Sequence, residues 1–205
     1  MKIERAIVAA AAVCSLAACN SKQQSPLHRQ DGDRSGAVGS ANPALQNEQL
    51  LPPGTVYQRT NAKFHAPEGQ KLSGTAKLEE VTGGVRIQVS VQDAPPNAKL
   101  AVHVDEKGDC TDMRDDSMGE HWNPRHAKHG PPDAVDHHLG DLGNLPTDDS
   151  GKGELLILTA GGNLRKDDPM SFVGRSIVVE DQADDGKPPR GGSGKAIGCA
   201  PIEPT

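Results

Sequence analysis

The sequence predicts an all-β domain of short strands joined by turns, either a sandwich or a barrel. Two observations predict it. Glycine and proline account for 23 and 16 of the 205 residues, which favours many turns over long helices. Several segments alternate between apolar and polar residues with the period of a half-buried strand, and none shows a convincing helical pattern. Because aromatic residues make up only 2% of the chain, we expect a core of Val, Leu, Ile and Ala.

The clearest strand runs from Val85 to Val91, where apolar and polar residues alternate strictly. A turn at residues 82–84 precedes it, so residues 74–80 are expected to form the partner strand of a hairpin. Two further strands are expected over residues 154–159 and 172–179.

Another strand contributes the first candidate site residues. Its valines, Val102 and Val104, alternate with His103 and Asp105. Because successive side chains of a strand point to opposite faces, we expect His103 and Asp105 to share one face and the valines the other.

The segment from Lys107 to Pro146 is predicted to be a long loop that is ordered by a metal. Such a long structureless segment is unusual in a domain unless something orders it. Three of its imidazoles and one of its carboxylates, which fall within 21 residues, form a set that suits tetrahedral zinc. These candidate ligands are His121, His129, His138 and Asp141. The alternative is a scatter of surface histidines, since the chain has eight.

The N-terminus has the features of an export signal. Lys2 and Arg5 precede an apolar stretch from Ala6 to Ala18 that is too short to span a bilayer. The stretch ends in Leu-Ala-Ala-Cys19, which resembles the bacterial lipobox, where the cysteine becomes the lipidated first residue. The alternative is an ordinary signal peptide with a chance cysteine.

We therefore expect a lipoprotein signal peptide at residues 1–18, a lipidated Cys19 with a flexible tether to residue 58, and a β domain at residues 59–205. This organisation predicts an envelope or periplasmic protein whose partner is the membrane that holds its acyl chains. Asn20 after the cysteine favours the outer membrane. The net charge of −6 argues against nucleic acid as a partner. No pattern indicates an oligomeric state or a protein partner.

Two cysteines remain after export. Cys14 lies in the removed segment and Cys19 is the lipidation site, which leaves Cys110 and Cys199 in an oxidising compartment. We expect these two to form a disulfide.

Taken in order, these motifs resemble the copper/zinc superoxide dismutase family. The similarity runs from about residue 71 to residue 202. The segments that carry it are residues 103–110, 119–124, 129–130, 138–144, 173–179, 183–185 and 199–202.

The resemblance implies an eight-stranded Greek-key β-sandwich or flattened barrel with a long metal-binding loop and one disulfide. It assigns zinc to the four ligands named above, with His121 bridging zinc and copper. It also makes Asp184 the aspartate that hydrogen-bonds ligands of both metals, and Cys110–Cys199 the family disulfide.

The copper site departs from the family pattern. Of the four histidines expected there, only His103 and His121 are present, while Asp105 and Glu180 occupy the other two positions. The arginine that guides superoxide is replaced by Ala196. Its neighbour Lys195 is expected to point to the other face of a strand. The resemblance therefore implies zinc binding, with copper binding and dismutation impaired.

Three functions remain open from the sequence. The first is a zinc-binding superoxide dismutase-like lipoprotein with weak or no dismutase activity. The second is an active dismutase, converting superoxide to oxygen and hydrogen peroxide, with copper or another redox metal held by two histidines and two carboxylates. The third is an envelope metal store or metallochaperone, to which the remaining histidines would contribute. Those histidines are His28, His65, His126 and His137.

Overall fold

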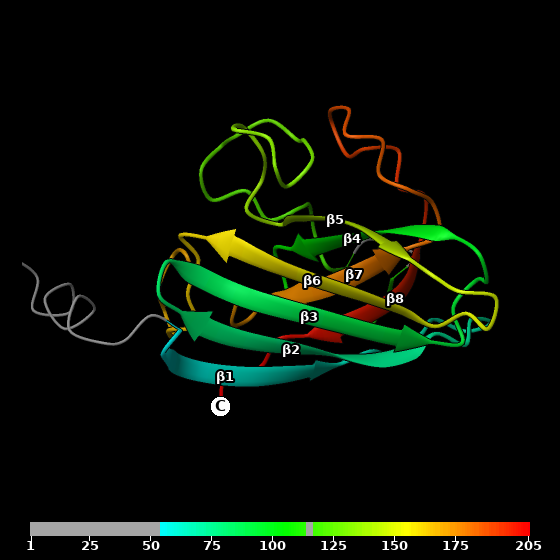
Figure 1. The fold of residues 1–205 in the computed structure, drawn as a ribbon, viewed down its shortest axis with the longest axis horizontal. Coiled ribbons are helices and arrows are strands. Elements are labelled where there is room, and N and C mark those ends of the chain that lie inside the picture. Colours follow the sequence, from blue (N-terminus) through cyan, green and yellow to red (C-terminus); the bar gives the residue numbers. More distant parts are fainter. Residues whose placement is uncertain (1–53, 114–116) are drawn as a thin grey trace, which may run out of the picture. The chain divides into compact units, whose positions relative to one another are not determined.

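The fold is described from a computed structural model, in which residues 54–113 and 117–205 are described. These residues form eight β-strands in two antiparallel sheets and contain no α-helix. The first sheet has the strand order β1-β2-β3-β6 and the second β5-β4-β7-β8 (Figure 1). The strands are β1 (Val56–Lys63), β2 (Ser73–Val81), β3 (Gly84–Gln92), β4 (Lys99–Asp105), β5 (Asp141–Pro146), β6 (Gly153–Ala160), β7 (Ser176–Glu180) and β8 (Ala196–Pro201).

The predicted all-β sandwich is confirmed, including the hairpin. β2 and β3 pair antiparallel from Ser73↔Gln92 to Val81↔Gly84, around a turn at the expected position. Contacts of β5 with β6 and of β1 with β8 bring the edges of the two sheets together, as in a flattened barrel. The sheets lie face to face in Figure 1, with the core between them.

Three boundaries differ from the sequence prediction. The strand predicted over residues 172–179 begins only at Ser176. Residues 172–175 instead form a turn, in which the Arg175 N–H donates to the Phe172 carbonyl. The segment predicted as a continuous loop to Pro146 ends in β5, which starts at Asp141 and pairs with β4. β1 begins at Val56, so the last three residues of the range assigned to the tether belong to the first strand.

The core is mainly aliphatic, as predicted, but it also contains most of the few aromatic side chains. Phe64, Trp122 and Phe172 are all buried, and the Trp122 and Phe172 rings meet edge to face with centroids 4.8 Å apart. In β4, Val102 and Val104 join this core. Because the strand alternates, its opposite face carries His103 and Asp105, and the long loop buries them there.

The disulfide between Cys110 and Cys199 is present, with Cα atoms 5.8 Å apart and a sequence separation of 89 residues. It ties the long loop to β8. The backbone of His65 forms a second link to β8, through hydrogen bonds of 2.8 and 2.9 Å with Cys199.

The predicted signal peptide, Cys19 and His28 lie outside the described residues. Among the described residues, no helix is long and apolar enough to cross a bilayer.

The outer face of the first sheet carries a charged cluster centred on Glu79. Cross-strand pairing places Arg59 and Arg86 on either side of it, and Lys77 lies two residues away on the same face. Arg59 Nε lies 3.0 Å and Lys77 Nζ 2.9 Å from Oε1, and Arg86 bonds Oε2. These three cations, Lys77 foremost, lower the pKa of Glu79 from 4.5 to about 2.

Because the folded pKa of Glu79 is depressed, its stabilising effect is complete above the unfolded value and is lost as the pH falls from about 4.5 towards 2. We expect Glu79→Gln to lower the free energy of unfolding at pH 7 by about 1 kcal/mol, since the cations are partly solvated. The difference from the parent should shrink as the pH falls through that range in urea titrations. Glu154→Gln, on the same sheet face, is the control and should cost less. An equal loss for both variants at pH 7 would contradict this account.

Candidate metal centre

The long loop is held against β4 by backbone hydrogen bonds at two points. The Trp122 N–H donates to Val104 O (2.7 Å), and the Val104 N–H donates to Gly140 O (2.8 Å). Gly140 also donates to Trp122 O, so three chain segments meet there. A Cβ at Gly140 would collide with the Val104 and Trp122 backbone, so only glycine fits. This junction fixes His121 on one side and His138 and Asp141 on the other.

Asp141 is the point on which three imidazoles converge. The Nδ1 atoms of His121, His129 and His138 lie 3.5, 3.1 and 3.2 Å from Asp141 Oδ1. Metal–ligand bonds of about 2.0–2.1 Å at tetrahedral angles place neighbouring ligand atoms about 3.3 Å apart. The three observed spacings therefore match the edges that meet at Asp141 Oδ1 in a zinc-sized tetrahedron. The other carboxylate oxygen, Oδ2, accepts the N–H groups of His138 (2.9 Å) and Gly130 (3.1 Å), which fixes the orientation of the carboxylate.

The protonation states of these groups suit a cation. Burial lowers the pKa of His121 and of His138, which favours the neutral, metal-binding imidazole. Burial opposes ionisation of Asp141, but the nearby His121 imidazole and the hydrogen bonds from the Gly130 and His138 amides outweigh it and lower the pKa of Asp141. Among the described residues, the buried Nδ1 atoms of His121 and His138 have no hydrogen-bond partner. Such atoms are costly to bury unless something coordinates them.

Asp184 connects this cluster to His103. Its Oδ1 lies 3.0 Å from His129 Nε2 and its Oδ2 lies 3.0 Å from His103 Nε2. Gly191 makes this approach possible, since a Cβ there would collide with the Asp184 carboxylate and lie 2.7 Å from His129 Nε2. The Asp184 amide in turn donates to Asn144 Oδ1 (2.8 Å), which fixes Asp184 relative to β5.

His103 is held by carboxylates at both ring nitrogens. Its Nδ1 donates to Glu180 Oε2 over 2.6 Å, and its Nε2 faces Asp184. Burial alone would lower the pKa of His103, but the two carboxylates raise it to about 9. The His103 ring also stacks on His121, with centroids 3.8 Å apart. Glu180 therefore closes onto His103 instead of facing it across an open pocket.

The donor atoms can be grouped in a second way. One ligand atom each from His103, His121, His129 and Asp141 all lie within 4.8 Å of one another, and all four residues are buried. His138 stands outside this quartet although its Nδ1 lies 3.2 Å from Asp141. We interpret the convergence on Asp141 Oδ1 as the better cation site, because three imidazole nitrogens lie within 3.5 Å of that one oxygen. His103, tied to Glu180 and Asp184, lies next to that site.

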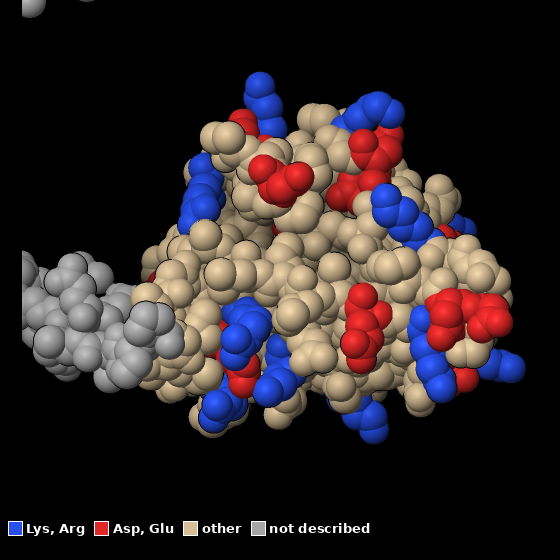
Figure 2. Space-filling model, in the orientation of Figure 1, with Lys and Arg blue, Asp and Glu red and all other residues tan. Residues whose placement is uncertain are grey.

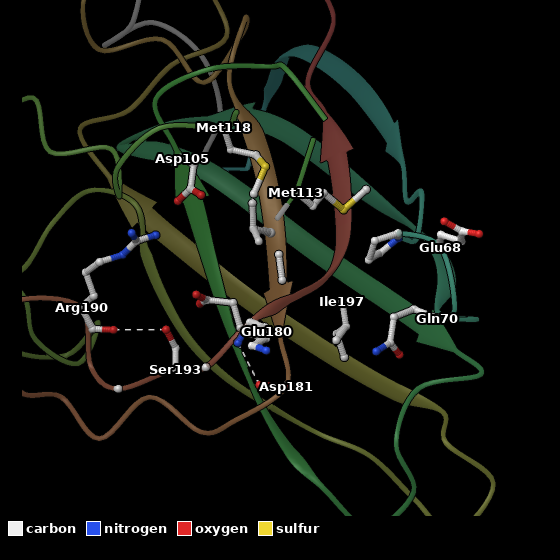
Figure 3. Close-up of a pocket in the computed structure, with 16 residues that line it drawn as sticks. Glu68, Gln70, Asp105, Met113, Met118, Glu180, Asp181, Arg190, Ser193 and Ile197 are labelled. Atoms are coloured by element: carbon white, nitrogen blue, oxygen red, sulfur yellow. Dashed lines mark hydrogen bonds between the residues drawn. The ribbon is translucent and has the colours of Figure 1, made fainter. Parts of the chain in front are cut away.

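A pocket of about 620 Å³ opens beside Glu180 and Asp105 (Figure 3). Ala196 and Lys195 both line it, and Lys195 is exposed just before β8, so it does not alternate within that strand as predicted. Sequence reasoning missed Arg190, which also lines the pocket and whose side chain points towards Asp105 in Figure 3. It lies in a loop of Pro and Gly, where no periodic pattern could have indicated its direction.

The other described histidines stand apart from the cluster. His126 is exposed, His137 Nδ1 donates to Ala134 O (2.8 Å), and His65 is exposed beside β8.

Comparisons with known proteins agree with this architecture. The family model of copper/zinc superoxide dismutase matches residues 72–202. "Superoxide dismutase [Cu-Zn] 2" of Aquifex aeolicus is 34% identical over 148 residues, which cover 70% of this chain and 86% of that protein. "Superoxide dismutase-like protein YojM" of Bacillus subtilis is 30% identical over 139 residues, covering 66% of this chain and 71% of the relative.

Solved structures show the same likeness. A superoxide dismutase-like protein from Bacillus subtilis has 28% sequence identity and a TM-score of 0.62, with 69% of this chain and 96% of that one covered. A double mutant of that protein, which carries histidine in place of a tyrosine and a proline, has 29% identity and a TM-score of 0.63, with 71% and 97% covered. The chain belongs to the copper/zinc superoxide dismutase family.

Proposed function

We propose that this protein is a zinc-binding, superoxide dismutase-like lipoprotein of the cell envelope with weak or no dismutase activity. The observation that carries the proposal is the contrast between two neighbouring sites. One gathers three imidazole nitrogens within 3.5 Å of Asp141 Oδ1. At the other, His103 is bonded to two carboxylates.

The zinc set fits the metal chemically as well as geometrically. His121, His129, His138 and Asp141 offer three nitrogens and one oxygen, a donor set that zinc accepts without a preferred geometry of its own. Asp184 orients His129 through Nε2, which leaves Nδ1 facing Asp141. Bound zinc would supply a crosslink between parts of the loop that have few apolar anchors.

The copper positions do not fit copper. Two of the four donors are the carboxylates Asp105 and Glu180, and hard oxygen donors favour Cu(II) over Cu(I), which opposes cycling between them. His103 Nδ1 already bonds Glu180 Oε2, so a metal would have to break that bond first. We therefore assign no reaction step to copper.

The electrostatics of the same pocket oppose an anionic substrate. A carboxylate about 4 Å from an anion costs roughly 4 kcal/mol at an effective dielectric of about 20. Asp105 and Glu180 both line the pocket, while Ala196 stands where the family has its guiding arginine. Glu68 and Asp181 line the pocket as well, so the two cations Arg190 and Lys195 offset only part of the charge of four carboxylates.

We expect one tightly held zinc per chain, with a structural role. Chelation should lower the melting temperature by on the order of 10 °C when zinc had been present at about a thousandfold above its Kd, equivalent to about 4 kcal/mol. His138→Ala should act like chelation, measured by metal analysis and thermal unfolding. His126→Ala, an exposed histidine of the same loop, is the matched control and should keep the zinc. An apo form as stable as the zinc-loaded form would count against a structural zinc.

We expect the unmodified protein to turn over superoxide far below the diffusion limit that efficient enzymes approach. Asp105→His combined with Glu180→His should raise copper affinity and bring back measurable dismutation. Either single change should do much less, because the remaining carboxylate still distorts the site. Adding Ala196→Arg should speed the reaction further, most at low ionic strength.

The matched control for the double variant is Glu106→His with Asp181→His, at the neighbouring exposed positions. It adds the same two imidazoles outside the four copper positions and should leave copper affinity unchanged. Copper-dependent dismutation near the diffusion limit by the unmodified protein would contradict the proposal. It would favour an active dismutase whose metal is held by two histidines and two carboxylates.

We expect acylation and membrane association of the protein to require Cys19. Cys19→Ser should abolish acylation and leave the protein soluble or unprocessed, as read by mass spectrometry and membrane fractionation. Cys14→Ser, in the segment expected to be removed, should change neither readout. Unchanged membrane partitioning of the Cys19→Ser variant would show that the lipobox assignment is wrong.

A further inference from the structure

The outer face of the first sheet is basic although the whole chain carries a net charge of −6. Strand register places four cations there, and two carboxylates bring the sum on this face to +2. The cations are Arg59, Lys63, Lys77 and Arg86, and the carboxylates are Glu79 and Glu154. Figure 2 views this side of the molecule, and blue side chains gather over the region of β1 to β3.

The same face exposes two large apolar side chains. Leu156 and Leu158 of β6 are 67% and 56% exposed. Register sets Leu158 beside Arg86 and Leu156 beside Gln88, so the leucines adjoin the basic cluster. Most other apolar residues of these strands point inward to the core. A surface that combines basic side chains with protruding apolar ones is typical of segments that bind at a membrane interface.

The charges on this face are held in place. Glu79 is nearly buried, with its side chain 8% exposed, beneath Arg59, Lys77 and Arg86, which are 63%, 51% and 44% exposed. The carboxylate thus holds the charged groups of three cations, while much of each side chain stays at the surface. Lys63 extends the basic row along β1, the edge strand of the sheet.

We propose that the outer face of the sheet β1-β2-β3-β6 docks on an anionic phospholipid surface. The basic charge on an otherwise acidic chain selects that occupant. The polypeptide also enters the described domain directly before β1, at an edge of this sheet. This second argument rests on the proposed anchor at Cys19, which would hold the same end of the chain at the membrane. Docking through this face would fix the orientation of the metal-binding loop relative to the lipid surface.

The test uses the full chain in the form that cells accumulate, with an environment-sensitive fluorophore on Gln88→Cys. Vesicles containing one third phosphatidylglycerol should shift its emission to the blue and raise its intensity, and 0.5 M salt should reverse the change. Vesicles of phosphatidylcholine alone should not. The same fluorophore on Val135→Cys, a fully exposed position in the long loop, should stay in water in both cases.

Charge variants identify the residues responsible. Lys63→Gln with Lys77→Gln should weaken the response to anionic vesicles about tenfold or more, since each basic side chain near the surface contributes roughly fivefold. Lys99→Gln with Lys107→Gln removes the same charge at the ends of β4 and should leave the response unchanged. Leu156→Ser with Leu158→Ser should reduce the blue shift while salt sensitivity persists. Thermal unfolding confirms that each variant folds.

The experiment distinguishes failure of the docking proposal from failure of the proposed lipid anchor at Cys19. Mass spectrometry of the purified protein reads acylation of Cys19 independently of the fluorophore at position 88. A lipidated protein whose position 88 stays in water on anionic vesicles would overturn the docking proposal and leave the anchor intact. A response of position 88 that depends on protein concentration without vesicles would instead identify a second copy of the chain as the occupant, and would equally overturn it.

Discussion

The convergence of three imidazoles on one oxygen of Asp141 is the constraint that organises this end of the molecule. Asp141 belongs both to the loop and to the first position of β5, so its carboxylate is set by a strand that pairs with β4. Its Oδ2 is held by two backbone amides, and only Oδ1 faces the histidines. The loop ligands are thus arranged around a fixed point of the sheet. Packing alone could not order such a loop, because most of its residues are polar, glycine or proline.

His103 shows how a buried imidazole can be fully paired by carboxylates. A buried imidazole with one carboxylate and no metal would leave a polar nitrogen unpaired, at a cost of about 1–3 kcal/mol. Glu180 and Asp184 pair both nitrogens, and the raised pKa of His103 follows from those two partners despite burial. His103 is therefore held by internal ion pairs at both ring nitrogens. Asp184 serves two imidazoles, since it orients His129 at the same time.

Period-2 alternation predicted the β2–β3 hairpin most clearly, and its absence hid β5. The β2–β3 hairpin was predictable because Val85 to Val91 alternates and a glycine turn precedes it. β5 was hidden because Asp141-Leu-Gly-Asn begins with a metal-binding side chain and contains glycine, so no alternation shows. The disulfide followed from cysteine arithmetic and the family resemblance. The closure of Glu180 onto His103 and the position of Arg190 depend on side-chain directions in three dimensions, which spacing along the chain does not encode.

Charge is distributed unevenly over this fold: one pocket is acidic and one sheet face is basic. At the pocket beside β4 and β7, the substituted positions Asp105 and Glu180 add negative charge where the family receives an anion. On the outer face of the other sheet, Glu79 gathers three cations into a basic patch. Long-range attraction of an anion therefore favours the sheet face over the pocket. The two surfaces thus differ in charge, and the basic one lies on the sheet that does not carry the candidate metal ligands.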